Sequence, residues 1–367
     1  MHVAVIGGGA VGTTTAHDLA ALGAEVTLFE AGAVAEGSSG RAAGVCYDAF
    51  ADRLDADLAT RALDRFRDRS GEGAFGFEDR PYVWLAREGD TRTVEAIESH
   101  VERMRANGLD VSLVSAAELG DRWPALVTDD VACAAVAENA GCADPAAYTE
   151  LMAARAREAG VTVREQTPAR LDGRAVNGDE YDAVVVAAGA HTRRVCEPVA
   201  PVPIKPYRVQ ALVTESVDIE TPQLYDASGG YYLRPRAGGL LVGDGTEPVE
   251  RDPDDWEREA DGWFLEACEG YERRALARSF SVERAWAGLC TATPDGNPLF
   301  GELTEGVFVA AGWQGHGFMR APAFSEILAN RVVSGIDHEA LHAFSPTRFD
   351  GDEDFEIVEG MARNVEG

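Results

Sequence analysis

The sequence is poor in lysine and has no long apolar run. Of its 33 basic residues only Lys205 is a lysine, and the 63 acidic residues leave a formal net charge of −30. Such an acidic surface repels phosphate backbones and anionic lipids, which disfavours nucleic-acid and membrane-surface binding. The apolar stretches are too short to span a bilayer. The charge balance is typical of proteins adapted to high salt, so we expect low salt to destabilise the fold.

The sequence also lacks paired cysteine motifs and a cationic leader. Its six cysteines are Cys46, Cys133, Cys142, Cys196, Cys268 and Cys290. None forms a CxxC pair, which predicts reduced thiols and a cytoplasmic setting. There is no nucleophile elbow, no Walker phosphate loop and no clustered set of metal ligands, so we expect no bound metal.

What the sequence does contain is a glycine-rich βαβ unit in its first thirty residues. A predicted strand over His2–Ile6 leads into Gly7, Gly9 and Gly12, then a predicted helix and a second strand that ends before Glu30. Glycines allow a tight turn and a close approach to a pyrophosphate, and the helix start offers free N–H groups. Glu30 stands where a carboxylate accepts hydrogen bonds from ribose hydroxyls, so the unit predicts a dinucleotide site.

Similar strand–glycine–helix segments recur in the middle and near the end of the chain. The run Tyr181–Gly189 and the segment 307–333 both have an unalternating apolar strand followed by glycine, which is typical of strands buried on both faces. Helices are expected over 54–69, 91–107, 145–160 and about 253–269.

We therefore expect an α/β protein, α+β overall, in which a discontinuous Rossmann-like domain carries an inserted antiparallel-sheet substrate domain. The Rossmann-like domain is assigned to residues 1–80, 136–205 and 285–349, the substrate domain to 81–135 and 206–284, and a loose acidic tail to 350–367.

Several segments together resemble the D-amino-acid-oxidase superfamily of flavoproteins, in particular the branch with sarcosine oxidase, glycine oxidase, dimethylglycine dehydrogenase and D-amino-acid dehydrogenase. In the family's order they are GGGAVG, GSSGRAAG, AAGAHT, KPYRVQ, YYLRPRAGGLLVG, WAGLCTATPDGNPLFGE and AAGWQGHGFMRAP. The resemblance implies that the Rossmann-like domain binds FAD. It further implies oxidation of the C–N bond of a small amine or amino acid by hydride transfer to flavin N5, followed by imine hydrolysis.

The same resemblance implies which residues hold FAD. The ADP half is assigned to Gly7, Gly9, Ala10, Val11, Gly12, Glu30 and Ala31. The pyrophosphate and ribityl groups are assigned to Ser38, Ser39 and Arg41, and the adenosine to Ala169, Ala188 and Gly189. The isoalloxazine is assigned to Gly312, Gln314, Gly315, His316, Gly317, Phe318 and Met319. A helix start in this last segment would stabilise negative charge on reduced flavin.

The departures from the family pattern concern the flavin link and the substrate. Gly288 stands where covalent-flavin relatives have a cysteine, so the resemblance implies noncovalent FAD. Cys290 and Met319 replace an arginine and a lysine that bind substrate carboxylate in relatives. Leu241 replaces an oxygen-activating lysine, which slightly favours a dehydrogenase over an oxidase. The electron acceptor, oxygen or an unknown carrier, stays open.

Tyr232 matches a tyrosine that hydrogen-bonds substrate carboxylate in relatives, although strand alternation leaves either Tyr231 or Tyr232 facing the site. We expect Tyr232, His316 and Arg320 in the catalytic centre, with Arg234 and Arg236 as further candidates for binding a carboxylate.

Two alternatives to amine oxidation stay open. One is a 2-hydroxy-acid dehydrogenase on the same fold, with His316 or His191 as base. The other is a flavin-carrying subunit of a larger complex without independent turnover. An NAD(P) enzyme is disfavoured, because three separated nucleotide-contact segments exceed what nicotinamide binding requires.

Overall fold

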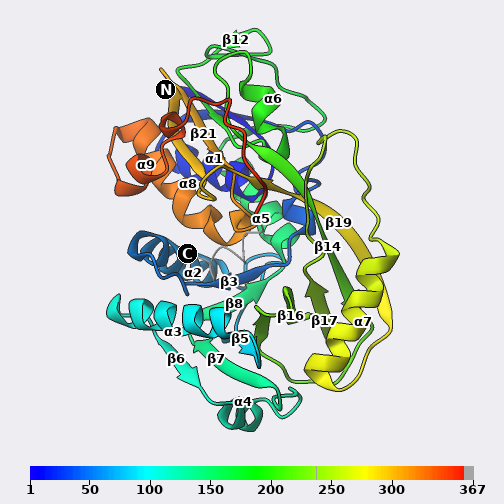
Figure 1. Ribbon diagram of the computed structural model, residues 1–367. Coiled ribbons are helices and arrows are strands. Elements are labelled where there is room, and N and C mark those ends of the chain that lie inside the picture. The colour runs from blue at the N-terminus through cyan, green and yellow to red at the C-terminus, as the bar shows by residue number, and fades with distance from the viewer. Residues whose placement is uncertain (237, 359–367) are drawn as a thin grey trace.

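The computed structural model describes residues 1–236 and 238–358, which are arranged around two large β-sheets (Figure 1). The first sheet has six strands, all parallel to their neighbours except for the antiparallel β20–β21 pair. In spatial order they are β20 (Leu299–Thr304), β21 (Val307–Ala311), β13 (Ala183–Val186), β1 (His2–Ile6), β2 (Glu25–Phe29) and β9 (Thr162–Arg164).

Both faces of this sheet are covered, which explains why its strands have unalternating apolar sequences. Val3 and Val5 point into one core cluster and Ala4 and Ile6 into another, as expected because successive side chains point to opposite faces. The first face carries the helices α1 (Ala10–Ala21), α5 (Pro145–Glu158) and α8 (Gly317–Ser334). The second carries β10 (Leu171–Asp172), β11 (Ala175–Val176), β12 (Asp179–Glu180) and α6 (Thr192–Cys196).

The second sheet has nine strands, with β19 paired to β14 beside the main order. These strands are β18 (Glu247–Glu250), β14 (Lys205–Thr214), β17 (Gly239–Gly243), β16 (Tyr231–Arg236), β15 (Gln223–Asp226), β5 (Tyr82–Arg87), β7 (Val131–Ala137), β6 (Val111–Val114) and β19 (Val282–Ala292). They confirm the expected mixed α/β class, while the exact division of the chain into domains stays a prediction.

Three helices cover parts of this second sheet. Its outer face packs against α4 (Ala116–Arg122) and α7 (Gly262–Leu276), and α7 lies along the outside of β16 and β17 (Figure 1). On its inner face α3 (Thr91–Ala106) packs against β5, β6 and β7. The inner face of β14, β16, β17 and β19 is turned toward the loop after β2, because Trp286 and Tyr232 cluster there with Ala43.

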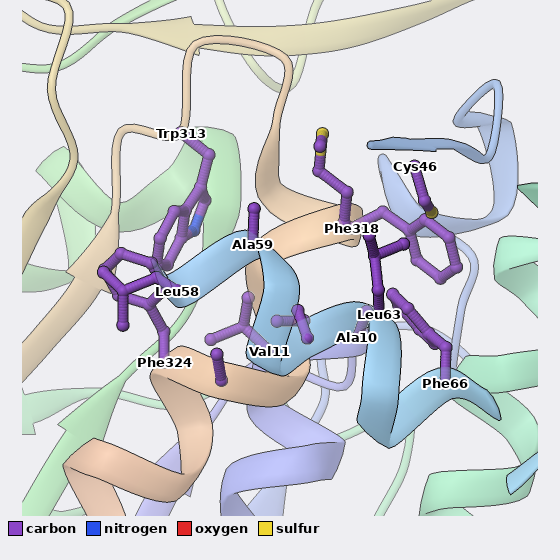
Figure 2. Close-up of a cluster of buried hydrophobic side chains, with 14 of the residues drawn as sticks. Ala10, Val11, Cys46, Leu58, Ala59, Leu63, Phe66, Trp313, Phe318 and Phe324 are labelled. Carbon is purple, nitrogen blue, oxygen red and sulfur yellow. The ribbon is translucent and has the colours of Figure 1, made fainter. Parts of the chain in front are cut away.

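The helix α2 (Arg53–Arg69) closes the core against α8. Asp52 caps its start by accepting from the Leu54 N–H at 2.9 Å, which satisfies an otherwise free donor. Figure 2 shows Phe66 of α2 beside Phe318 of α8, and their ring centroids are 5.0 Å apart. The remaining elements are β3 (Val45–Tyr47), β4 (Phe77–Asp79), β8 (Ala140–Ala143), α9 (Glu339–Ala343) and the short helices Ser39–Arg41, Gly189–His191 and Pro346–Arg348.

The expected helix at about 253–269 is wrong in its position. The helix begins only at Gly262, and residues 251–260 are irregular. Arg208 donates from Nε to the Glu257 carbonyl at 2.8 Å and from Nη2 to the Glu259 carbonyl. Carbonyl oxygens that accept from Arg208 compete with the hydrogen bonds of a helix. This contact therefore outweighs the helical spacing of the residues in this segment.

The expectation of a loose tail after Phe349 is wrong for residues 350–358. Lys205 Nζ lies 2.9 Å from a carboxylate oxygen of Asp354 and 2.6 Å from the Phe355 carbonyl. The sole lysine therefore anchors the described part of the tail to β14. The rest of the assigned tail lies outside the described residues. Among the helices of 1–236 and 238–358, none has both the length and the apolar character needed to cross a membrane.

Candidate active site

The glycine loop between β1 and α1 is a cradle in which side chains do not fit. Gly7 has φ +117°, and a Cβ on it would lie 2.3 Å from the Ala187 carbonyl oxygen after β13. A Cβ on Gly12 would lie 1.9 Å from the Gly7 carbonyl oxygen. These glycines let β1, β13 and α1 approach one another closely, as a dinucleotide cradle requires.

The carboxylate of Glu30 lies directly against this loop. Its Oε2 accepts from the Gly8 N–H at 2.6 Å, and its Oε1 accepts from the Gly32 N–H at 2.8 Å. Each carboxylate oxygen can accept a further hydrogen bond, so Glu30 keeps acceptor capacity for ribose hydroxyls. Ala31, beside it in sequence, is exposed.

The N-cap residue of α1 is Gly9, which has no side chain that could cap the helix. Instead the Ala10 N–H donates to Ser39 Oγ at 2.9 Å. The side chains of Ala10 and Val11 are buried in the core (Figure 2). First-turn amides together with a hydroxyl form an arrangement that suits a pyrophosphate.

The loop that contains Ser38 and Arg41 connects α1 with the second sheet. Ser38 Oγ donates to the Leu289 carbonyl of β19 at 2.6 Å. Trp286 Nε1 donates to the Arg41 carbonyl at 3.0 Å, and Arg41 Nη1 donates to the Gly37 carbonyl at 3.1 Å. The predicted pyrophosphate and ribityl segment is thereby held between the two sheets.

The residues assigned to adenosine lie around the core cluster that contains Ala4 and Ile6. Ala169 and Ala188 are partly buried and pack against the same cluster as Phe29, at the end of β2. Gly189 has φ +53° and follows Ala188 in the turn after β13. The structure thus brings these residues close to the end of the strand that precedes Glu30.

Close packing also surrounds the glycines of the segment after β21. A Cβ on Gly312 would lie 2.5 Å from Thr293 Cγ2, and one on Gly317 would lie 3.0 Å from the Trp313 ring. Gly315 has φ +85°, and a Cβ on it would lie 4.0 Å from Cys290 Sγ. This segment therefore lies directly against the end of β19.

Gln314, assigned to the flavin ring, is held by other parts of the chain. Its N–H donates to the Thr291 carbonyl at 2.9 Å, its Oε1 accepts from the Thr293 N–H at 3.4 Å, and its Nε2 donates to the Val358 carbonyl. Gln314 therefore connects the loop before α8 with the end of β19 and the described end of the tail.

His316 is buried at the start of α8 and hydrogen-bonded. Its Nε2 lies 3.1 Å from Tyr47 Oη, and the rings of Tyr47 and Phe50 contact it edge-on. Burial, with the positive charge of Arg320 as a second cause, lowers the pKa of His316 to about 3. The imidazole is therefore neutral at physiological pH.

Arg320 is paired inside the protein. Its guanidinium lies 2.9 Å from a carboxylate oxygen of Asp55, and it stacks over the Phe50 ring at 4.9 Å. Both charged side chains are buried or nearly so. A substrate carboxylate would therefore have to share Arg320 with Asp55.

Phe318 and Met319 point into the core. Figure 2 shows Phe318 beside Phe66. The centroid of the Phe318 ring lies 5.0 Å from that of Phe66 and 5.7 Å from that of Tyr148. Met319 is 5% exposed in the same cluster. If these two residues contact the flavin as assigned, the contact is made by their backbone atoms.

Of the two tyrosines of β16, Tyr232 faces the inner side. Tyr231 stacks on Tyr271 of α7 on the outer side, with centroids 5.1 Å apart. The Tyr232 ring covers Gly243, where a Cβ would lie 2.5 Å from its hydroxyl. Burial, and then the charge of Asp244, raise the pKa of Tyr232, so its phenol stays a hydrogen-bond donor.

Arg234 and Arg236 bind to the protein itself. Arg234 is 3% exposed and donates to the backbone carbonyls of Ala43 and Ala143. Burial lowers its pKa. Arg236 lies 3.3 Å from the carboxylate of Asp144, the residue that caps α5. Arg234 therefore has a structural role in this fold.

The departures from the family pattern lie on the same inner face. Cys290 follows Gly288 on β19, and a Cβ on Gly288 would lie 3.3 Å from Arg41 Cβ. Leu241 is completely buried and belongs to the same cluster as Tyr232 and Trp286. Sequence reasoning missed Tyr47, Phe50 and Trp286 as members of this region, because their contacts connect distant segments.

In residues 1–236 and 238–358 no group of three or more His, Cys, Asp or Glu side chains could hold a metal ion. Two surface hollows, of about 410 and 450 Å³, are lined by other residues, including Arg80 and Trp123 in one and Asp18 and Arg65 in the other. Neither hollow contains a predicted site residue.

Comparison with curated proteins gives several relatives. The chain is 28% identical to 4-methylaminobutanoate oxidase (formaldehyde-forming) of Paenarthrobacter nicotinovorans, over 96% of this chain and 46% of that protein. It is 27% identical to glycine oxidase of Geobacillus kaustophilus, over 95% of this chain and 97% of that one. The chain spans about half the length of the first three curated relatives, 46%, 55% and 41%.

Solved structures agree with these relatives. L-proline dehydrogenase from P. horikoshii superposes with a TM-score of 0.87 at 28% identity, covering 96% of this chain and 98% of that one. Glycine oxidase from Geobacillus kaustophilus has a TM-score of 0.82 at 24% identity, covering 95% and 98%.

A family model described as "DAO: FAD dependent oxidoreductase" matches residues 2–331. The glycine cradle that a Cβ would fill, with Glu30 beside it, fits the cofactor of that family. The chain therefore belongs to the FAD dependent oxidoreductase family, and its cofactor is FAD.

Proposed function

We propose that the protein oxidises the C–N bond of a small amine or amino acid of the sarcosine, glycine or D-amino-acid type. The names of its relatives support this, since they include a methylaminobutanoate oxidase, a glycine oxidase and an L-proline dehydrogenase. Bound FAD would accept a hydride from the substrate carbon. The amine then becomes an imine, which water hydrolyses.

The residues around the glycine cradle hold this cofactor in our proposal. Gly7 and Gly12 allow the close approach of β1, β13 and α1 that forms the cradle. Glu30 accepts from the ribose, and Ser39 and the first amides of α1 surround the phosphates. The segment Gly312–Phe318 brings the start of α8 to the flavin ring. The link to FAD is noncovalent, because Gly288 offers no nucleophile.

The burial of His316 and its hydrogen bond to Tyr47 are the observations that favour an amine over a hydroxy acid. Oxidation of a hydroxy acid needs a base for the hydroxyl proton, whereas a neutral amine needs none. An imidazole with a pKa of about 3 accepts a proton weakly at neutral pH. The other candidate base, His191, is exposed and lies 2.9 Å from the carboxylate of Asp254.

Tyr232 is the residue that we propose to bind the substrate's carboxylate. Its protonated phenol faces the inner side of the sheet, and a weakly polar pocket favours the neutral amine. Tyr47 holds His316 and Asp55 holds Arg320 in place. Leu241 is buried where relatives have the oxygen-activating lysine, which supports an electron acceptor other than oxygen. We place the enzyme in the cytoplasm.

An anaerobic flavin-bleaching screen in high salt tests this proposal. The compounds are sarcosine, dimethylglycine, glycine, proline and D-amino acids, with lactate and other 2-hydroxy acids as the competing class. We expect at least one amine to bleach the flavin and to yield an aldehyde or keto acid together with a shorter amine or ammonia. Reoxidation of the reduced enzyme by oxygen should be slower than by an artificial electron carrier.

Two outcomes would replace the proposal. Bleaching by hydroxy acids alone would assign the enzyme to hydroxy-acid oxidation. Bleaching by no compound until a partner protein is added would make the chain a flavin-carrying subunit.

A further inference from the structure

Four strands bring Tyr232 and Trp286 into one row across the inner face of the second sheet. Tyr232 pairs with Gly243, Gly243 with Ala211, and Ala211 with Trp286. Directly paired residues share a face of a sheet, and Tyr232, Ala211 and Trp286 belong to one cluster with Leu241. The row therefore extends from the proposed substrate tyrosine to the indole of β19.

Arg284 stands one row farther along the same face. It precedes Trp286 by two residues on β19, and its partner on β14 is Val213. Two residues along a strand span about 7 Å. Cys290, which lies beside the predicted flavin segment, is on the opposite side of Trp286. Arg284 thus lies in the row next to that of Tyr232 and Trp286, on the far side of Trp286 from Cys290.

Arg284 belongs to a group of arginines around two indoles, which we call the arginine–tryptophan cluster. Its members are Arg41, Arg236, Arg258, Arg284, Trp256 and Trp286. Arg284 lies 5.0 Å from the Trp286 ring centroid, and Arg258 lies 5.2 Å from that of Trp256. The Ala287 N–H donates to the Arg258 carbonyl at 2.9 Å, which fixes the Arg258 segment against β19.

An ion pair with Asp144 balances the charge of Arg236, but not every arginine of this cluster has such a partner. Within residues 1–236 and 238–358, neither Arg258 nor Arg284 forms an ion pair with a carboxylate. Both are exposed, although the protein carries a net charge of −30. Burial lowers the pKa of Arg41, and the charges of Arg258 and Arg284 lower it further. Cation–π stacking holds the guanidinium planes while their N–H edges stay available.

We propose that the arginine–tryptophan cluster binds a second anionic group of the substrate, a carboxylate or a phosphate, a few carbon atoms from the oxidised C–N bond. This inference rests on the proposed function and narrows its substrate class to acidic amino acids or amines. Arg258 and Arg284 make the contact, because the carbonyl contacts of Arg41 and the Asp144 contact of Arg236 already engage those two side chains. Planar guanidinium groups bind carboxylate and phosphate through paired hydrogen bonds.

Matched substrates test this preference in the FAD-loaded enzyme at constant high salt. Glutamate is compared with glutamine, and O-phosphoserine with serine, as both enantiomers and in their N-methyl forms, by anaerobic flavin reduction. We expect the acidic member of at least one pair to be oxidised, and so to reduce the flavin, with the higher kcat/KM. The two pairs distinguish a carboxylate from a phosphate.

Variants then assign the preference to the cluster. In Arg284→Gln and in the double variant with Arg258→Gln, the ratio of kcat/KM for the acidic over the neutral member should fall about tenfold or more, through KM. Arg278→Gln is the matched control. Arg278 is another exposed arginine, and it stacks over Phe280 outside the cluster. An equal fall of kcat/KM for both members, or no fall, would overturn the proposal.

A binding measurement separates this proposal from the proposed function. Glutarate should change the indole fluorescence saturably, glutaramide should not, and the double variant should lose the response. If no amine bleaches the flavin, the proposed function fails. In that case the fluorescence response to glutarate still supports the anion site, and the absence of the response overturns the anion site. Loss of FAD from the double variant would assign the cluster to the cofactor and also overturn the proposal. So would binding of acidic proteins without any binding of small anions.

Discussion

The missing side chain of Gly12 decides how closely α1 approaches β1. A Cβ at this position would lie 1.9 Å from the Gly7 carbonyl oxygen. That atom is backbone, and it belongs to the loop that Glu30 holds through the Gly8 N–H. The loop has little freedom to move away, so one methyl group would displace the helix start from the proposed pyrophosphate position.

Gly12→Ala should therefore abolish FAD binding and lower stability. We expect overpacking to reduce the free energy of unfolding by about 1–3 kcal/mol, and the purified protein to lose most of its flavin absorbance. The measurements are the flavin-to-protein absorbance ratio and urea unfolding in high salt.

The matched control is Gly270→Ala, in the middle of α7. A Cβ on Gly270 meets nothing within 4 Å, so this alanine should stabilise the helix by about 0.5–1 kcal/mol. A Gly12→Ala protein with full flavin content would contradict the cradle assigned to this loop.

Sequence reasoning predicted the parts of the site that depend on local pattern. Gly7, Gly12 and Glu30 follow from the spacing of one βαβ unit, and the structure brings them together. Tyr47 could not be found in this way, because its hydrogen bond to His316 joins residues 269 positions apart. Whether each residue contacts FAD stays a prediction.

At the scale of elements, a buried ion pair joins two strands that are far apart in the sequence. Arg87 of β5 donates from Nε to Asp226 of β15 at 2.6 Å, and these side chains are 2% and 0% exposed. Asp226 also accepts from the Gly229 N–H at 3.0 Å. Because β5 and β15 are parallel neighbours, this pair holds the two halves of the nine-stranded sheet together.

Asp226→Asn should lower the free energy of unfolding by about 3–5 kcal/mol, because it leaves the charge of Arg87 buried with less compensation. Urea unfolding in high salt measures this change. Asp130→Asn is the control, since Asp130 contacts the same arginine but is 38% exposed, and it should cost about 1 kcal/mol or less. Equal losses for both variants would contradict the buried pair as the source.

Helix α7 contributes a titrating group within its buried face. Glu272 is 2% exposed, and burial raises its pKa to about 7, while the Phe280 N–H that it accepts at 3.0 Å opposes the shift. The folded protein therefore holds a proton between pH 4.5 and about 7 that the unfolded chain releases. This contribution to stability is complete below pH 4.5 and is lost as the pH rises through about 7.

Glu272→Gln should remove that loss. Between pH 5 and pH 8 the free energy of unfolding of the unmodified protein should fall by roughly 2–3 kcal/mol more than that of the variant. Urea unfolding across this pH range measures the difference. Glu266→Gln, at an exposed position of the same helix, should follow the unmodified protein. Parallel curves for Glu272→Gln and the unmodified protein would contradict the assignment.

The bounds of α7 show where sequence patterns are insufficient at this scale. Helices α2, α3 and α5 begin within one residue of their expected starts, because caps and apolar spacing are local signals. The expected helix start near residue 253 was wrong, because Arg208 binds the carbonyls of Glu257 and Glu259. That arginine is about 50 positions away, so no local pattern indicates the contact.

At the scale of the whole molecule, acidic residues exceed basic ones by 30. Many basic side chains already lie in surface ion pairs, such as Arg61–Glu326 and Arg194–Asp252, and each exposed pair contributes about 0–1 kcal/mol. The sequence has too few basic residues to pair with the excess carboxylates. Their mutual repulsion therefore destabilises the folded state. Salt weakens both effects, but the long-range repulsion extends over the whole surface.

We therefore expect the melting temperature to rise with salt. The Debye length shortens from about 30 Å at 0.01 M to about 3 Å at 1 M, so most of the rise should occur as screening becomes shorter than the spacing of surface carboxylates. Thermal unfolding in KCl from dilute buffer to molar salt measures it. Sucrose at matched osmolality is the control, because exclusion of a neutral solute stabilises proteins without screening charge. A melting temperature that is unchanged by KCl, or that rises equally in sucrose, would mean that repulsion among the carboxylates does not limit the stability of this fold.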